Sequence, residues 1–498
     1  MIQVSTWILD ISGLTNQSVD EVINNQDLSE NEFALQSYMH AMSAQLRGDS
    51  QKAIVFLESA LEQDPEFKQA WYELAIAYRK QGNYKKSLAI LDSIKQTSTN
   101  LAYKVQMVKG HTLDSMKKFP QALEAYQQSY DIAKTLGSND KISAIQVSRA
   151  ITYINLEDFI KARDLLDAAL QLTNPESQAQ FYGVIMNNYA KLEKVQRNFE
   201  EARVYTSKAI DAFIKSGNKS SEMAAKTRLS SLLLHLGMLA EAEELAKESL
   251  NYAKLQNQIK SISSNHFKLG LIYHAIGKFK DSKDHWLSAL EINKNLDLAL
   301  EKAAIFEYLI NLHIDFHDIE NTQLYLKSLA DLAKQQPLKS IKNILMRANF
   351  KYALARKDIS QAQQILAAYQ GKVTKNMSML YGDLALLQKK YLAAENHYIT
   401  ALQGFSQTSD NLKITQVMNR LNKLYLIDSI DIVKAEKNIS SMQQYNPFAY
   451  PYLKYKAILS FKQGKKIKAI SLLQELKLKA NDYWQAEDQL LLEQYQKH

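Results

Sequence analysis

The polar and hydrophobic positions of this chain follow the period of an α-helix, and a turn signal interrupts the helical pattern at regular intervals. Each signal has a turn residue, an apolar or aromatic residue two positions later, and a small residue three positions after that. Residues 82–87 (GNYKKS) and 277–282 (GKFKDS) show it most clearly. The pattern predicts packed helical hairpins rather than isolated helices.

The small residue of this signal recurs along most of the chain. From Ala122 to Ala362, six successive spacings are 40 residues each, and the other spacings lie between 32 and 41. A second small residue recurs seven positions further on, two turns along the same helical face, so that neighbouring helices can approach closely. The first series comprises Ala53, Ser87, Ala122, Ala162, Ala202, Ala242, Ser282, Thr322, Ala362, Ala394, Ala435 and Ala469.

This repeat predicts an all-α protein, a right-handed α-solenoid of about twelve helical hairpins in which each hairpin buries its apolar face against its neighbours. We expect residues 1–31 to form an N-terminal capping segment, residues 32–480 the superhelix, and residues 481–498 a C-terminal capping helix. The chain has 14 glycines and 6 prolines among 498 residues, too few for the turns of a β-sandwich, a barrel or a loop-rich α/β enzyme.

The composition excludes several classes of site. With no cysteine, the chain has no zinc ribbon, thiol nucleophile, iron–sulfur cluster or disulfide framework. The first ten residues lack a basic segment and include Asp10, which argues against a secretory signal, and no apolar run is long enough for a membrane span. We expect a cytoplasmic protein, or a periplasmic one if the chain is a fragment of a membrane-anchored regulator. A net charge of +8 is modest for this length, so direct contact with nucleic acid is not expected.

One repeat carries a recognisable family pattern. Residues 71–87 resemble a tetratricopeptide repeat, and residues 269–289 match that pattern nearly as well. The resemblance covers about residues 32–480, with departures such as His313 in place of Tyr and His317 in place of Gly. The residues that carry it in the first of these units are Trp71, Leu74, Ala75, Tyr78, Gly82, Tyr84 and Ser87.

A narrower stretch, residues 34–71, is similar to the effector regions of bacterial winged-helix transcription regulators. No DNA-reading domain precedes that stretch in the sequence. A sensory interpretation would therefore need the chain to be a fragment of a longer regulator or to act with a separate output domain.

The tetratricopeptide resemblance implies a concave groove, formed by the first helix of each hairpin, that holds an extended peptide or a partner helix. Asn side chains there could pair with a peptide backbone, and Lys or Arg could hold carboxylates. The alternative is that these positions are ordinary solvated helix faces. Counting back from the aligned small residues gives Asn187, Lys191, Lys194, His274, Glu307, Asn311, Arg347 and Lys351 as candidate groove residues.

The strongest charge feature lies near the C-terminus. Between residues 450 and 480 the sequence has many lysines against the single acidic residue Glu475. This segment is either a patch that docks an acidic partner or a solvated outer face that keeps the array soluble. The possible docking patch comprises Lys454, Lys462, Lys465, Lys466 and Lys468.

Signals for catalysis are weak. His313 and His317 have the i, i+4 spacing of a metal site, but no third ligand accompanies them and both fall on repeat positions, so packing explains them more simply. No nucleotide-binding, nucleophile-elbow or zinc-protease motif is present. We therefore expect no enzyme, no metal and no cofactor.

These observations predict a non-catalytic scaffold or adaptor that binds another protein or a peptide on a concave superhelical face. The alternative is a regulatory module of a bacterial transcription regulator that senses a peptide or a small ligand.

Overall fold

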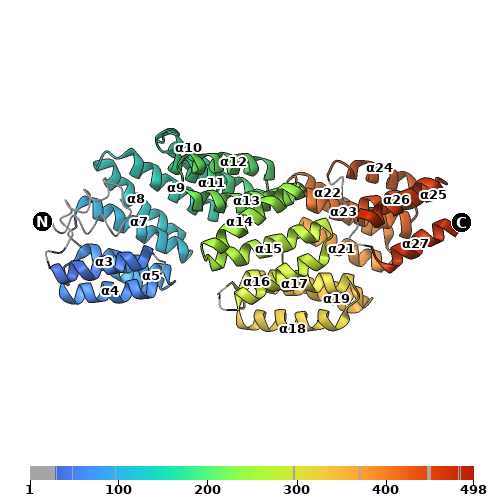
Figure 1. The fold of residues 1–498 in the computed structure, drawn as a ribbon, viewed down its shortest axis with the longest axis horizontal. Helices are drawn as coiled ribbons and strands as arrows, with labels where there is room; N and C mark the ends of the chain where they lie inside the picture. Colours follow the sequence, from blue (N-terminus) through green and yellow to red (C-terminus); the bar gives the residue numbers. More distant parts are fainter. Residues whose placement is uncertain are drawn as a thin grey trace. The chain divides into compact units, whose positions relative to one another are not determined.

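The computed structural model describes residues 29, 31–46, 49–95, 97–294, 296, 298–369, 371, 373–445, 450–479, 482 and 484–497. The described residues form α-helices and one short π-helix, with no strand among them, which confirms the all-α class. They fall into two compact units, residues 1–192 and residues 193–498, and α11 runs across the boundary (Figure 1). Nearly all of the predicted N-terminal capping segment lies outside the described residues.

The first unit is built from successive antiparallel helix pairs. α3 packs on α4, α5 on α6, α7 on α8, and α9 on α10. Its helices are α3 (Glu32–Leu46), α4 (Ser50–Gln63), α5 (Lys68–Lys80), α6 (Tyr84–Ser93), α7 (Thr99–Ser115), α8 (Phe119–Thr135), α9 (Asn139–Asn155), α10 (Phe159–Gln171) and α11 (Ala179–Val195).

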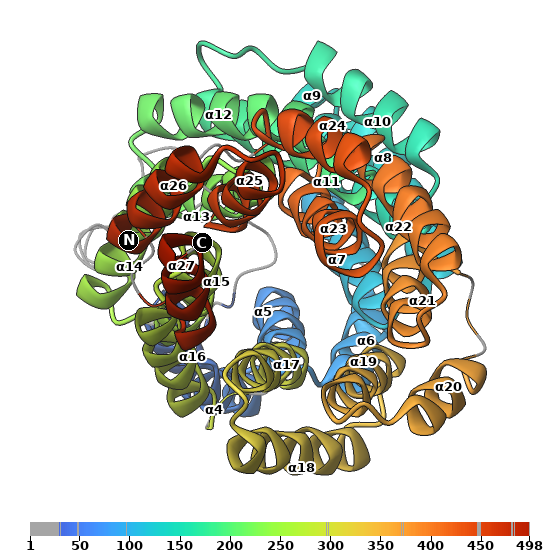
Figure 2. The ribbon, with the colours of Figure 1, turned by 90° about the vertical axis from the view of Figure 1, so that its right-hand side faces the viewer.

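The second unit continues the same pairing, and in Figure 2 its helices α13, α15, α17, α19 and α23 lie on the inner side while α14, α16, α18, α20, α22 and α24 lie outside. The π-helix extends α23 in the region where the repeat signal is poorest. The helices are α12 (Phe199–Lys215), α13 (Lys219–Leu236), α14 (Leu239–Leu255), α15 (Ile259–Ile276), α16 (Phe279–Asn293), α17 (Ala299–Asp315), α18 (Ile319–Gln335), α19 (Lys339–Ala355), α20 (Ile359–Ala367), α21 (Lys375–Leu387), α22 (Tyr391–Ser406), α23 (Asn411–Lys423), η1 (Leu424–Asp428), α24 (Ile432–Met442), α25 (Tyr450–Lys462), α26 (Lys466–Lys479) and α27 (Ala486–Lys497).

The aligned small residues form the seam within each hairpin. All twelve residues of the series that begins at Ala53 and ends at Ala469 have no exposed surface. A larger side chain at any of these positions would separate two helices that are in close contact. The helical hairpins therefore pack against one another with the repeat period that the sequence predicts.

In most of the described hairpins, the turn has one residue in the left-handed backbone conformation. Glycine occupies this position at Gly82, Gly237 and Gly277. In other repeats Lys117, Glu157, Arg197, His317 and Lys357 adopt it with φ between 55° and 64°. Left-handed backbone costs a non-glycine residue about 1–2 kcal/mol, and the hairpin packing holds it in place. Glycine is therefore scarce in the chain although the turns recur.

Side chains at the first positions cap many of the helices. Asp158, Asp318, Asp358 and Asp431 each accept a hydrogen bond from the backbone N–H three residues later, at distances from 2.9 to 3.2 Å. Such caps satisfy N–H groups that have no partner within the helix. Their recurrence explains why a chain so rich in helix divides into short, well-bounded segments.

Candidate functional site

The inner helices of the second unit carry charged residues at equivalent repeat positions. Glu307 on α17 and Arg347 on α19 are 40 residues apart, and they form a two-pronged ion pair. The Arg347 Nε atom donates to Glu307 Oε1 at 2.8 Å, and Nη2 donates to Oε2 at 2.6 Å. Residues at i and i+40 on these helices thus stand side by side, and both members of this pair belong to the predicted groove.

Three polar groups beside this pair have no direct partner. Asn311 on α17 has a buried side-chain oxygen that accepts no hydrogen bond. Lys351, one repeat later, and Asp315, one helical turn after Asn311, each lack an ion pair within 4.0 Å among the described residues. Burial lowers the pKa of Lys351 and raises that of Asp315. We call Asn311, Asp315 and Lys351 the central cluster.

The sequence analysis missed a second ion pair of the same inner face. Arg420 on α23 donates from Nε and Nη2 to the two oxygens of Asp383 on α21, at 2.7 and 3.2 Å, and the Tyr398 hydroxyl donates to Asp383 at 2.9 Å. Lys413 lies near this pair, and burial together with repulsion from Lys351 lowers its pKa to about 8. The 40-residue period ends at Ala362, so counting by repeats did not reach these residues.

The other predicted groove residues are dispersed. Asn187 and Lys191 lie on α11 in the first unit, where the Asn187 side-chain oxygen is buried without a partner. Lys194 lies on the same helix but in the second unit, and it is exposed. His274 packs against the rings of Phe279 and Trp286 at 5.3 and 5.7 Å, and burial lowers its pKa to about 4, so the ring is neutral near pH 7.

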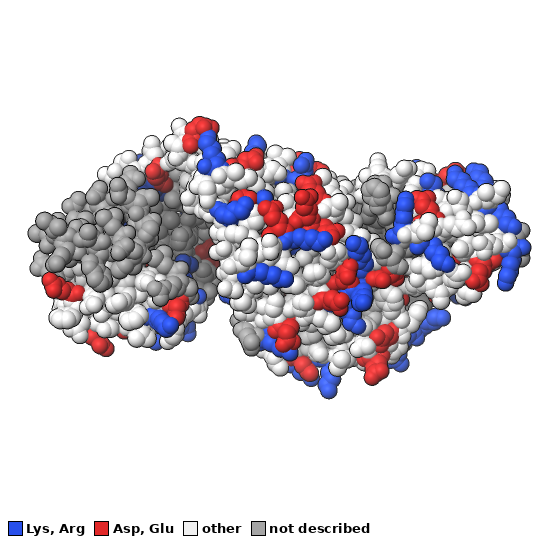
Figure 3. All heavy atoms as spheres, in the orientation of Figure 1, with Lys and Arg blue, Asp and Glu red and all other residues white. Residues whose placement is uncertain are grey.

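The predicted basic patch is smaller than expected. Lys454 forms an ion pair of 2.6 Å with Asp488, whose side chain is only 1% exposed, so this lysine connects α25 to α27 and is not available for docking. Lys462, Lys465 and Lys468 are exposed, and Lys466 is half-buried. Figure 3 shows basic side chains gathered over the C-terminal helices.

The two histidines with metal-like spacing do not face a common site. His313 is buried, and its Nδ1 atom lies 2.9 Å from Asp318 Oδ2. His317 occupies the left-handed turn position with φ of 55°. No group of three or more His, Asp or Glu side chains suited to a metal ion occurs within the described residues.

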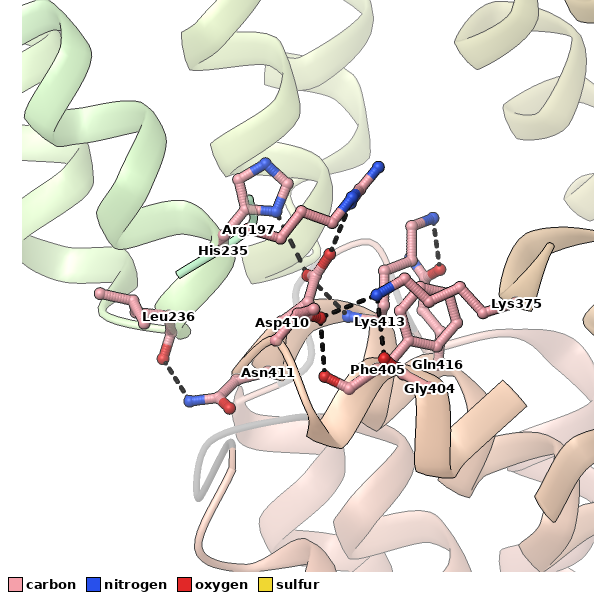
Figure 4. A network of polar contacts seen from close by, with 11 residues as sticks. Arg197, His235, Leu236, Lys375, Gly404, Phe405, Asp410, Asn411, Lys413 and Gln416 are labelled. Carbon is pink, nitrogen blue, oxygen red and sulfur yellow. Dashed lines mark hydrogen bonds and ion pairs between the residues drawn. The ribbon is translucent and has the colours of Figure 1, made fainter. Parts of the chain in front are cut away.

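Helices α13 and α23 meet although they are far apart in the sequence. Asp410, which is fully buried, lies 3.2 Å from His235 Nδ1 and 3.6 Å from Arg197 Nη1. The Asn411 side chain donates to the Leu236 carbonyl at 2.9 Å. Figure 4 shows Asp410 and Asn411 at the start of α23 beside His235 and Leu236 of α13, Arg197 of the α11–α12 turn and Lys375 of α21.

This junction joins segments 175 residues apart and brings one superhelical turn of the second unit against the next. A Cβ atom added to Gly237 would lie only 2.8 Å from the Tyr445 carbonyl oxygen, so the backbones are also close there. A second contact of the same kind is the hydrogen bond of 2.9 Å from the Lys280 N–H to Asp482. Both contacts join segments of the second unit that are far apart in the sequence.

Comparison with known proteins supports the repeat assignment. The family model described as "Tetratricopeptide repeat" matches residues 44–104. The structure is similar to the crystal structure of the APC/C hetero-tetramer Cut9-Hcn1, with a TM-score of 0.52, 17% identity, and coverage of 92% of this chain and 81% of that chain. The predicted resemblance to tetratricopeptide-repeat proteins is therefore confirmed.

One sequence comparison and one further structure comparison cover part of the chain. Response regulator aspartate phosphatase I of Bacillus subtilis is 22% identical over 191 residues, 38% of this chain and 47% of that protein, so the match spans about half of the relative's length. The apo form of RapI is structurally similar with a TM-score of 0.39 and 17% identity, covering 52% of this chain and 97% of that chain. No helix among the described residues combines the length and the apolar character that crossing a bilayer requires.

Proposed function

We propose that this chain is a non-catalytic scaffold that binds an extended segment of a partner protein on the inner face of its second unit. The observation that carries the proposal is the central cluster of Asn311, Asp315 and Lys351. A buried carbonyl without a partner costs about 1–3 kcal/mol, and Asn311 Oδ1 is such a group. Lys351 beside it is half-buried without a direct ion pair, and Asp315 is exposed at the same place, so all three are positioned to receive groups from a partner.

An extended peptide would satisfy all three groups. Its backbone N–H could donate to Asn311 Oδ1, its carbonyl or a carboxylate could accept from Lys351, and its amide or a basic side chain could donate to Asp315. The neighbouring ion pairs Glu307–Arg347 and Asp383–Arg420 hold the walls in fixed positions. The resemblance to a subunit of a hetero-tetramer agrees with a partner-binding role.

The test removes the central cluster without changing net charge. We would compare the variant N311A/D315N/K351Q with the matched outer variant N396A/D331N/K327Q, whose residues are exposed on α22 and α18. Each protein is used as bait in the lysate of the organism that encodes it. We expect a polypeptide that the wild type and the outer variant retain and the inner variant loses. Equal retention by both variants would contradict the proposal.

A second candidate is a regulatory module that responds to a peptide or a small ligand. The junction at Asp410 favours it, because a contact between superhelical turns could tighten or loosen when the inner face is occupied, and the Bacillus relative is by name a response-regulator phosphatase. Small-angle scattering with and without candidate peptides tests this function. A ligand-dependent change in radius of gyration supports sensing, and an unchanged radius with a bound ligand supports a passive scaffold.

A further inference from the structure

The inner face of the second unit has one region where several basic side chains form no direct ion pair among the described residues. Arg228 on α13 and Lys268 on α15 are 40 residues apart, the same separation that brings Glu307 beside Arg347. They therefore occupy equivalent positions in adjacent repeats. In each repeat this position is one residue after the position that Glu307 and Arg347 occupy in theirs. Tyr308, 40 residues after Lys268, continues the row, and Lys194 on α11 lies near its start. We call Lys194, Arg228, Lys268 and Tyr308 the basic row.

The cations of the basic row form no direct ion pair with the described residues, although Glu301 lies close enough to act on Lys268. Neither Lys194 nor Arg228 forms an ion pair with any carboxylate in the described part of the chain. Lys268 donates one hydrogen bond of 2.7 Å to Ser264, which is uncharged. The nearby Glu301 is already held by Ser263 at 2.9 Å and Asn293 at 3.0 Å.

The basic row is accessible yet enclosed. Lys194 and Arg228 are exposed, and Lys268 is half-buried. Burial and repulsion from the neighbouring Arg228 lower the pKa of Lys194. Burial is also the main cause that lowers the pKa of Lys268, to about 8. Arg228 and Lys268 belong to α13 and α15, which lie on the inner side in Figure 2. A half-buried cation such as Lys268 interacts with an anion more strongly than a fully solvated surface lysine does.

We propose that the basic row is the subsite that receives the acidic part of the bound partner segment, with carboxylates of an extended peptide pairing with Lys194, Arg228 and Lys268. This inference rests on the proposed function and adds the chemical class of the ligand. Successive repeats place the cations about 8–10 Å apart, and side chains two residues apart in an extended strand are separated by about 6.6–6.8 Å. Flexible Lys and Arg side chains bridge that difference, so acidic residues at alternate positions could each reach a cation.

The probe is a fluorescein-labelled octaglutamate peptide, with octaglutamine as the uncharged control, and the readout is fluorescence anisotropy of the full chain at constant ionic strength. The inner variant K194Q/R228Q/K268Q and the outer variant K327Q/K334Q/K437Q lose the same charge, and the outer one removes exposed lysines of the outer helices α18 and α24. We expect the inner variant to bind octaglutamate at least about tenfold more weakly, which is the effect of three partly screened ion pairs. The outer variant should bind within about twofold of wild type.

Several outcomes overturn the proposal: no saturable binding of octaglutamate to wild type, equal affinity of wild type and inner variant, or an equal loss in both variants. The single variant R228K keeps the charge and should retain binding, so a loss caused by misfolding of the triple variant is recognised. If the basic row fails this test while N311A/D315N/K351Q still loses its partner, the scaffold function stands and only the acidic character of the ligand is wrong.

Discussion

At the scale of single residues, Asp410 combines two roles that can be separated. Its side chain caps α23 by accepting a hydrogen bond of 3.3 Å from the Lys413 N–H, and it faces His235 and Arg197 across the junction. Burial acts to raise the pKa of Asp410, but the hydrogen bond and charge of His235 and the charge of Lys413 outweigh it and hold the pKa below its usual value. The ionised carboxylate therefore stabilises the folded state.

The variant D410N tests this stabilisation, because asparagine caps helices as well as aspartate does but carries no charge. We expect D410N to lower the free energy of unfolding by about 2 kcal/mol at pH 7. A carboxyl whose pKa is lowered on folding stabilises above its unfolded pKa of about 3.9 and loses that contribution as the pH falls through the folded value. Urea unfolding at pH 7, 5 and 3 should thus show a difference that persists at pH 5 and shrinks at pH 3.

The control for this prediction is D358N. Asp358 caps α20 through the Gln361 N–H at 2.9 Å, and its side chain accepts no other hydrogen bond among those described. It should change stability by a few tenths of a kcal/mol at most. An equal effect of both variants, or a D410N effect that does not depend on pH, would show that the charge of Asp410 does not stabilise the junction.

At the scale of the helical hairpin, close approach depends on small residues facing large ones. Gly270 on α15 lies against Trp286 on α16, which has no exposed surface, and Gly110 and Gly382 face Tyr126 and Tyr398 in the same way. In each case the aromatic residue follows the glycine by 16 positions. The glycines are required by contact and not by backbone conformation, because each lies within a helix.

The variant G270A should destabilise the fold by about 1–3 kcal/mol because the new Cβ would overlap the indole ring of Trp286. In the control G404A the nearest atom is Lys375 Cβ at 3.1 Å, which needs to shift by only a few tenths of an ångström, so the gain in helix propensity should offset most of the strain. Thermal unfolding followed by circular dichroism compares the two. Equal melting temperatures would mean that α15 and α16 can move apart to accept the new Cβ without a loss of stability.

At the scale of the whole molecule, the repeat period determines how much could be predicted. The period placed Ala162, Ala202 and Ala242 in the core and put Glu307 and Arg347 in one groove, because each repeat adds the same geometry. It did not reach Asp383 and Arg420, since the spacing changes to 32 and 41 residues after Ala362. The contact between Asp410 and His235 spans 175 residues, and no local pattern could have indicated it. The extents of the two capping segments stay predictions.

Residues that serve binding and have no partner within the chain should contribute little to the free energy of unfolding. Because Asn311, Asp315 and Lys351 have no direct partners, the variant N311A/D315N/K351Q should unfold at the same urea concentration as wild type or at a higher one. The matched outer variant N396A/D331N/K327Q should be unchanged. A large loss of stability in the inner variant alone would mean that the three residues serve the fold, and the binding role of the central cluster would be wrong.

The most direct test of the central claim is site-specific photocrosslinking. A photoreactive amino acid replaces Lys351 on the inner helix α19 in one protein and Lys327 on the outer helix α18 in another, and each is irradiated in the source lysate. We predict a covalent adduct with one partner polypeptide from position 351 and none from position 327. An adduct of that partner formed from position 327 and absent from position 351 would place binding on the outer face and contradict the account.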